Sequence, residues 1–285
     1  MRSFRIVVTV LFIICLASYI GMGIVEDRTT DTDGPEFALE SDEPLALSVE
    51  DGDDVLLSGI TASDSKDGDL TDEIIISGHS YFSQEGTCTV KYYVFDSDNN
   101  FASLSRTVTY TDYESPTFTI TDPITYAAGS STHVIDYLQA YDVLDGDLTS
   151  QIVITENNIN TSYSGIYSVT AQVTNSYGDI EEIVFNVVVR ESDSPSITLT
   201  ENLVYIETGD DFEALDYISS VASSSGTLLV REEGSTLIWS QNSEYLGSIV
   251  IDDGVDTSEE GCYQVVYSLN TGSGTGYACL SVVVR

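Results

Sequence analysis

Apolar and polar residues alternate along most of the chain. Residues 86–96 read GTCTVKYYVFD, so Cys88, Val90, Tyr92 and Val94 share one side of an extended segment. A period of two is typical of a strand with one buried face. Ser, Thr and Gly interrupt such stretches at intervals of about eight to twelve residues, which is the spacing of strands in an all-β sandwich. The pattern predicts an all-β protein.

The alternating segments recur three times in one order. Pro35, Pro116 and Pro195 each follow an acidic linker and open a strand, at intervals of 81 and 79 residues. A glycine then precedes a long alternating strand in each copy, at Gly86, Gly165 and Gly261. Copies of about 80 residues with six or seven short strands favour immunoglobulin-like sandwiches. We expect three tandem Ig-like modules: module 1 at residues 35–111, module 2 at 115–190 and a divergent module 3 at 194–285.

The first 25 residues show a different pattern. Arg2 and Arg5 precede residues 6–25, which carry no charge and are long enough to span about 30 Å of hydrocarbon as a helix. The basic flank places the N-terminus in the cytoplasm and the rest of the chain outside the cell. A membrane anchor is favoured over a cleaved signal peptide, because the A-x-A pattern of a cleavage site is absent. Residues 26–34 are expected to form a polar tether.

The chain is strongly acidic. Lys and Arg number 9 and Asp and Glu number 47, so the net charge is −38. Such a surface repels nucleic-acid phosphates, and we expect no nucleic-acid partner. The 42% of hydrophobic and 10% of aromatic residues are too many for an acidic disordered tail. The carboxylates therefore cover the surfaces of folded modules.

Modules 1 and 2 share an acidic motif. ASDSKDGDLTDEI at residues 62–74 and AYDVLDGDLTSQI at 140–152 both follow A-x-D-x-x-D-G-D-L-T-x-x-I. Together with the long strand after each Gly and the final T-x-T-V-x-V strand, the motif resembles the bacterial Ig-like domains named after the pesticidal crystal protein. The resemblance covers most of residues 35–190 and implies tandem repeats on surface or secreted proteins, without assigned catalysis. Module 3 departs from it, reading SVASSSGTLLV at 220–230 where the acidic loop should lie.

The acidic loops have two possible roles. In an Ig-like order, each loop meets the turn between the last two strands at one end of the sandwich. Crowded carboxylates on a Gly-containing loop suit Ca²⁺, but Asp before Gly is also an ordinary turn former, and both interpretations stay open. A cation between modules 1 and 2 would stiffen their joint, whereas the second joint at 191–194 is expected to be more mobile. The candidate calcium ligands are Asp64, Asp67, Asp69, Asp96, Asp112, Glu114, Asp142, Asp145 and Asp147.

The cysteines suggest one disulfide. Cys262 and Cys279 flank the turn NTGSGTG, nearly symmetrically about Asn270 and Thr271, and an extracellular setting permits oxidation. We predict that these two are bonded and that Cys88 is a free core thiol. Two free thiols in module 3 are the alternative.

The sequence predicts no enzyme. It has no G-x-S-x-G, H-E-x-x-H or P-loop motif, and its two histidines, His79 and His133, lie in different modules. We expect a non-enzymatic stalk, spacer or adhesin, stiffened by Ca²⁺ if the acidic loops bind it, on the outer face of the membrane or secreted. Its partners would be the membrane, through residues 6–25 if uncleaved, and an extracellular protein or glycan. The alternative is a carbohydrate- or protein-binding accessory module with module 3 as its tip, where Trp239 is the candidate ligand-binding residue.

Overall fold

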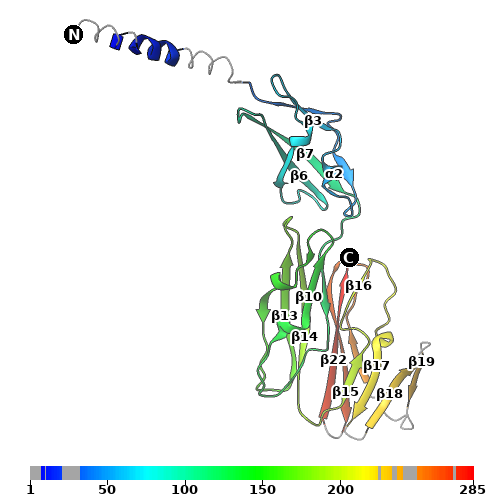
Figure 1. The fold of residues 1–285 in the computed structure, drawn as a ribbon. Coiled ribbons are helices and arrows are strands. Elements are labelled where there is room, and N and C mark those ends of the chain that lie inside the picture. Colours follow the sequence, from blue (N-terminus) through cyan, green and yellow to red (C-terminus); the bar gives the residue numbers. More distant parts are fainter. Residues whose placement is uncertain are drawn as a thin grey trace. The chain divides into compact units, whose positions relative to one another are not determined.

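The computed structural model describes residues 8–9, 11–20, 33–223, 226–232, 236–239, 249–271 and 274–285. The chain divides into two compact units, Met1–Tyr113 and Glu114–Arg285. Beyond the helical residues 8–9 and 11–20 and a few single turns, the described elements are strands (Figure 1), so the predicted all-β class is confirmed.

The described residues near the N-terminus, 8–9 and 11–20, are helical. Within the described part of the chain, no helix has the length and hydrophobicity needed to cross a membrane. Residues 6, 7, 10 and 21–25 of the expected anchor lie outside the described residues. The anchor therefore stays a prediction.

Module 1 is a two-sheet sandwich. Its first sheet has the order β1-β3-β4 and its second the order β2-β7-β6-β5. The alternation in residues 86–96 becomes the alternate burial of β6, whose inward Val90, Tyr92 and Val94 are 3% exposed or less. The strands and helical turns are β1 (Glu36–Leu39), β2 (Leu45–Leu47), α2 (Asp53–Leu56), β3 (Ile60–Asp64), β4 (Gly68–Asp69), η1 (Thr71–Glu73), β5 (Ile75–His79), β6 (Thr87–Phe95) and β7 (Phe101–Tyr110).

Module 2 repeats this topology. Its sheets have the orders β11-β10-β8 and β12-β13-β14-β9, and β9 pairs in parallel with β14 as β2 does with β7. Phe185, Val169 and Val187 fill the space between the sheets. The elements are β8 (Thr117–Ile120), β9 (Thr125–Ala127), η2 (Val134–Tyr137), β10 (Leu138–Asp142), β11 (Gly146–Asp147), η3 (Thr149–Gln151), β12 (Val153–Asn157), β13 (Gly165–Thr174) and β14 (Ile180–Arg190).

Module 3 has a wider first sheet. The orders are β15-β17-β18-β19 and β16-β22-β21-β20. Where modules 1 and 2 have the acidic loop and a two-residue strand, module 3 has a hairpin of β17 and the seven-residue β18, with β19 added beyond it. The elements are β15 (Ser196–Leu199), β16 (Leu203–Ile206), η4 (Ala214–Tyr217), β17 (Ile218–Ser223), β18 (Gly226–Glu232), β19 (Thr236–Trp239), β20 (Ile249–Asp253), β21 (Gly261–Thr271) and β22 (Gly274–Val284).

Modules 2 and 3 lie side by side in the second unit, with β14 next to β22 (Figure 1). Val283 of β22 belongs to the buried cluster of module 2, and Leu203, Tyr205 and Cys262 pack against that cluster. The expectation of a more mobile second joint is therefore wrong. Outward apolar side chains of module 3 are covered by module 2, so the two modules share a core.

A polar contact joins the ends of these two modules. The Arg285 guanidinium donates to the carbonyl of Pro116 (2.7 Å) and to Oε1 of Glu181 (3.1 Å), and it lies 4.2 Å from the centre of the Tyr205 ring. The Tyr205 hydroxyl accepts the backbone N–H of Phe118 (2.8 Å). Arg285, which follows β22, thus contacts module 2 at Pro116, just before β8, and at Glu181 of β14. Tyr205 of β16 adds a bond to β8.

Candidate binding surfaces

The acidic loop of module 1 is a hydrogen-bonded turn. Oδ1 of Asp64 accepts the backbone N–H groups of Lys66 (2.7 Å) and Asp67 (3.0 Å). Oδ1 of Asp69 accepts the N–H of Thr71 (3.0 Å). These donors lower the pKa of both carboxyls, through the Asp67 and Lys66 amides at Asp64 and through the Thr71 hydroxyl and amide at Asp69. Each carboxylate already serves the backbone that follows it.

The middle Asp of each motif reaches the turn between the last two strands. In module 1 the Asp67 carboxylate accepts the backbone N–H and the hydroxyl of Ser97, both at 2.9 Å. In module 2 the Asp145 carboxylate accepts the same two groups of Ser176, at 2.5 and 2.8 Å. The loop and the turn meet at one end of the sandwich, as Ig-like topology requires. Hydrogen bonds join them in both modules.

The first Asp of module 2 is fully satisfied. Oδ1 of Asp142 accepts the N–H groups of Leu144 (2.9 Å) and Asp145 (2.8 Å), and Oδ2 accepts Nδ2 of Asn175 (3.1 Å). Asp142 is 1% exposed. Asp147 accepts the N–H of Thr149 (2.9 Å), which lowers its pKa together with the Thr149 hydroxyl. The Asn175 amide thus caps a buried carboxylate.

Module 1 differs at this position. Asp96 occupies the place of Asn175. Its Oδ1 accepts the N–H groups of Asp98 (2.9 Å) and Asn100 (2.7 Å). In the same way, Oδ1 of Asn175 accepts the N–H groups of Tyr177 and Asp179. Within the described residues, Oδ2 of Asp64 is buried and has no hydrogen-bond partner. A carboxylate therefore stands where module 2 has an amide donor.

The linker residues bear on the predicted calcium joint. Asp112 accepts the hydroxyl of Ser48 (2.6 Å) and the N–H of Val49 (2.8 Å), which lower its pKa. These bonds hold Asp112 within the first unit, and Glu114 is the first residue of the second. Among the residues that the structure describes, no group of three or more His, Cys, Asp or Glu is placed to hold a metal ion. The calcium site stays a prediction.

The predicted disulfide is wrong. Both cysteines are free, because β21 pairs with β22 in a register that places Cys262 opposite Val283 and Cys279 opposite Val266. The positions are four residues apart along the ladder, or about 13 Å, and a disulfide requires Cα atoms within about 7 Å. The Cys262 thiol donates to the carbonyl of Val184 in module 2 (3.3 Å). Burial raises the pKa of Cys262, and raises that of Cys279 to about 12.

Two residues singled out by the sequence analysis remain, Trp239 and Cys88. Trp239 ends β19 and pairs with Leu229 of β18; the structure describes only its backbone. Cys88 is a buried core thiol, 1% exposed, whose pKa is raised by burial to about 11. The prediction of a free core thiol at Cys88 is confirmed.

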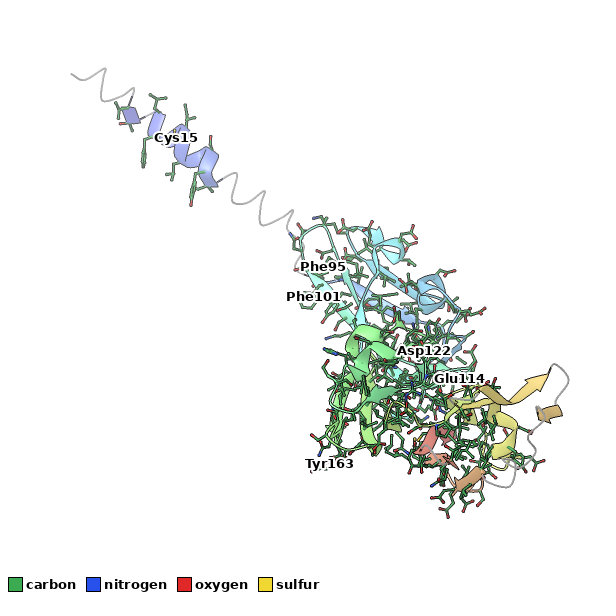
Figure 2. All side chains as sticks on the ribbon, turned by 90° about the horizontal axis from the view of Figure 1, so that it is seen from below. Cys15, Phe95, Phe101, Glu114, Asp122 and Tyr163 are labelled. Atoms are coloured by element: carbon green, nitrogen blue, oxygen red, sulfur yellow. The ribbon has the colours of Figure 1, made fainter. Side chains whose placement is uncertain are left out.

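The sequence analysis missed an aromatic surface on module 1. We call the solvent side of β5, β6 and β7 the outer face. Phe95 and Phe101 are 48% and 60% exposed on it (Figure 2), with ring centres 5.9 Å apart, and Tyr93 lies 6.1 Å from Phe101. Lys91 lies 4.9 Å from the centre of the Tyr93 ring. The outer face consists of Ile75, Thr89, Lys91, Tyr93, Phe95, Phe101, Ser103 and Ser105.

A shallow groove of about 360 Å³ continues this face. It is lined by Ser77, His79, Ser80, Thr89, Lys91 and Ser105. None of the residues of the outer face or of the groove lining is Asp or Glu, in a chain with 47 of them. The signal was present in the sequence: the outward positions of residues 89–95 read Thr, Lys, Tyr and Phe, without one acid.

Known proteins match parts of the chain. The family of the Ig-like domain of bacterial surface proteins matches residues 37–110. The pesticidal crystal protein Cry22Aa of Bacillus thuringiensis is 36% identical over 137 residues, 48% of this chain and 17% of that protein. An uncharacterized 81.3 kDa protein of Acholeplasma phage L2 is 34% identical over 86 residues, 30% of this chain and 12% of that protein. The chain thus spans less than a fifth of either relative.

Solved structures are similar only at a low level. The CBM51-2 and INT domains of Clostridium perfringens ZmpB in complex with GlcNAc have 21% identity and a TM-score of 0.23, covering 57% of this chain and 30% of that one. The protocadherin gammaB4 extracellular domain has 12% identity and a TM-score of 0.21, covering 90% and 52%. TM-scores this low indicate no shared overall structure. The match over residues 37–110 confirms, for this part of the chain, the resemblance expected from the D-G-D motif: these residues are similar to the Ig-like domain of bacterial surface proteins.

Proposed function

We propose that the chain is a non-enzymatic bacterial surface or secreted protein, whose Ig-like modules act as a spacer and an adhesin. One observation carries the spacer role: modules 2 and 3 share a buried core and are tied together through Arg285, Tyr205 and Glu181. A spacer must keep its shape under load. A shared core resists bending more than a flexible linker between separate modules does.

The carboxylates, histidines and thiols that could carry out catalysis have structural roles or lie apart, which supports a non-catalytic role. The D-G-D carboxylates accept backbone N–H groups of their own modules. The two histidines lie in different units, and the thiols of the buried Cys88 and the half-buried Cys279 have raised pKa values, so neither is an activated nucleophile.

Attachment through residues 6–25 is part of the proposal. Protease treatment of intact cells, or of protoplasts if a wall shields the protein, should digest the Ig-like modules. A matched sample lysed before treatment is the control. Protection of the modules until lysis would contradict the extracellular location.

Calcium stiffening is a separate part of the proposal. If the acidic loop of module 2 binds Ca²⁺, millimolar Ca²⁺ should raise the melting temperature by mass action on the folded state. Asp147→Ala should remove most of that increase, and Asp122→Ala is the matched acidic control. Identical melting in Ca²⁺ and in chelator would leave the loops as structural turns, as their hydrogen bonds already permit.

A second role as a binding module is favoured by the outer face of module 1. Its exposed Phe95 and Phe101 form an apolar patch beside a polar groove, which is the composition of a recognition surface. This observation moves the proposed binding site from Trp239 in module 3 to module 1.

A further inference from the structure

We propose that the outer face of module 1 binds a neutral polysaccharide, with sugar rings packed on Phe95 and Phe101 and sugar hydroxyls bonded in the adjoining groove. The inference deepens the binding role proposed above and rests on it. Three features of the face carry it: its charge, its rings and its hydrogen-bonding groups.

The charge of the face separates it from the rest of the molecule. The chain carries a net charge of −38, yet the outer face and the groove lining contain no carboxylate and include Lys91. A ligand covering this face would therefore not have to remove water from any ionised carboxylate, which is costly when the charge is left unpaired. An acidic polysaccharide would still meet the field of the surrounding carboxylates, so a neutral chain is the better partner.

The rings of Phe95 and Phe101 form an apolar surface, which we call the ledge. Phe95 and Phe101 pair across β6 and β7 in register, and their ring planes are inclined by 39°. Phe95 and Phe101 are 48% and 60% exposed, so both rings are accessible to a ligand. The C–H face of a pyranose ring is apolar and slightly positive, so it packs on the negative face of an aromatic ring.

The groove supplies the hydrogen bonds. Its lining includes Ser77, Thr89 and Ser105, which carry hydroxyls, and Lys91, which carries an ammonium group. A hydroxyl both donates and accepts, and an ammonium donates three bonds, which suits the hydroxyls of a sugar. The aromatic residues of the face would also suit a protein partner, but the groove beside them is lined by Ser and Lys, which are depleted in protein–protein interfaces relative to other surfaces.

The spacing favours a chain over a single sugar. The groove begins at Thr89 and Lys91 and the ledge ends at Phe95, so the face follows β6 for most of its length. Seven residues of strand extend about 20 Å, enough for several sugar units. A polysaccharide reaches both the ledge and the groove.

Affinity electrophoresis of the full chain tests the proposal. Native gels cast with mannan, dextran, galactan or starch, and with polygalacturonate as the acidic comparison, measure retardation of the strongly acidic protein. We expect at least one neutral polysaccharide to retard the chain, with little effect of added salt, and polygalacturonate to retard it less. Phe101→Ala should weaken retention about tenfold, the loss of one stacked ring with its contact area.

Two variants separate a lost site from a lost fold. Phe101→Tyr keeps the ring and should bind as the parent chain does. Tyr163→Ala removes a 70% exposed aromatic residue of module 2 and should not change binding. Unchanged melting of Phe101→Ala is expected, since its side chain is largely exposed.

Several outcomes would overturn the inference. Retardation by none of the neutral polysaccharides, equal or stronger retardation by polygalacturonate, or equal loss in Tyr163→Ala would each do so. A protein partner lost on Phe101→Ala, without glycan binding, would make the face a protein interface. The spacer role and the surface location, tested by protease treatment of cells, would stand in every one of these cases.

Discussion

Removing the hydroxyl of Tyr205 should loosen modules 2 and 3 from each other. This hydroxyl accepts the backbone N–H of Phe118 at 2.8 Å and also bonds to the carboxylate of Glu181. Phe118 is 3% exposed, so its N–H has no ready access to water once the hydroxyl is gone. Burial raises the pKa of Tyr205, and the group therefore remains a neutral hydroxyl near pH 7.

The size of the effect follows from this geometry. Leaving one buried donor unpaired costs about 1–3 kcal/mol, and Tyr205→Phe changes the packing by one oxygen only. For a unit the size of Glu114–Arg285, each kcal/mol lowers the melting temperature by roughly 2–4 °C. Together these two ranges predict that the melting temperature of the second unit falls by roughly 2–12 °C. The melting temperature of the first unit should change little.

Differential scanning calorimetry of the full chain measures both transitions. Tyr163→Phe, at a 70% exposed position of the same unit, is the matched control and should melt as the parent does. If Tyr205→Phe and Tyr163→Phe melt alike, the contact between the modules carries no stability, and the argument for a shared cooperative unit fails.

Three further predictions follow from single side chains. Asp96→Asn combined with Asn100→Asp, which copies Asn175 and Asp179 of module 2, should raise the melting temperature of module 1, because the new amide can donate to the unpartnered Oδ2 of Asp64 without facing the Asn100 amide that now donates to Asp96 (2.8 Å); a lower value would show that the two modules differ at this site. Burial raises the pKa of Glu181 in the folded state, so the folded state binds more protons and stability should fall as pH rises from the unfolded value of about 4.5. Glu181→Gln should reduce that fall in stability in urea titrations at several pH values, and an unchanged pH dependence would assign it to other groups. Cys262 and Cys279 should resist alkylation in the native protein and react after denaturation without reductant, whereas a mass two hydrogens lower in the non-reduced chain would restore the disulfide.

Local pattern was enough to predict the strands and the meeting of loop and turn. The period of two placed Val90, Tyr92 and Val94 in the core, and the Asp-Gly-Asp spacing predicted a sharp turn after β3 and β10. These features depend on side-chain alternation and on local hydrogen bonds, which act over a few residues. The sequence alone therefore predicts them.

The register between β21 and β22 could not be predicted from the sequence in this way. Counting from the ends of NTGSGTG suggested that Cys262 faces Cys279, but the ladder of β21 and β22 sets Cys262 against Val283. A shift of register by four residues keeps every inward side chain inward, so alternation alone does not distinguish the alternatives. Packing of the whole module does, because it fixes which pairs of residues meet across the hairpin.

Tertiary structure also decided what lies against each outward surface. Cys262 and Val283 of module 3 and Phe95 and Phe101 of module 1 all occupy outward strand positions in the sequence pattern. The first two are covered by module 2, whereas the two phenylalanines remain exposed. Alternation separates the two sides of a strand but contains no information about a neighbour distant in the sequence, and burial of an outward side chain depends on that neighbour alone.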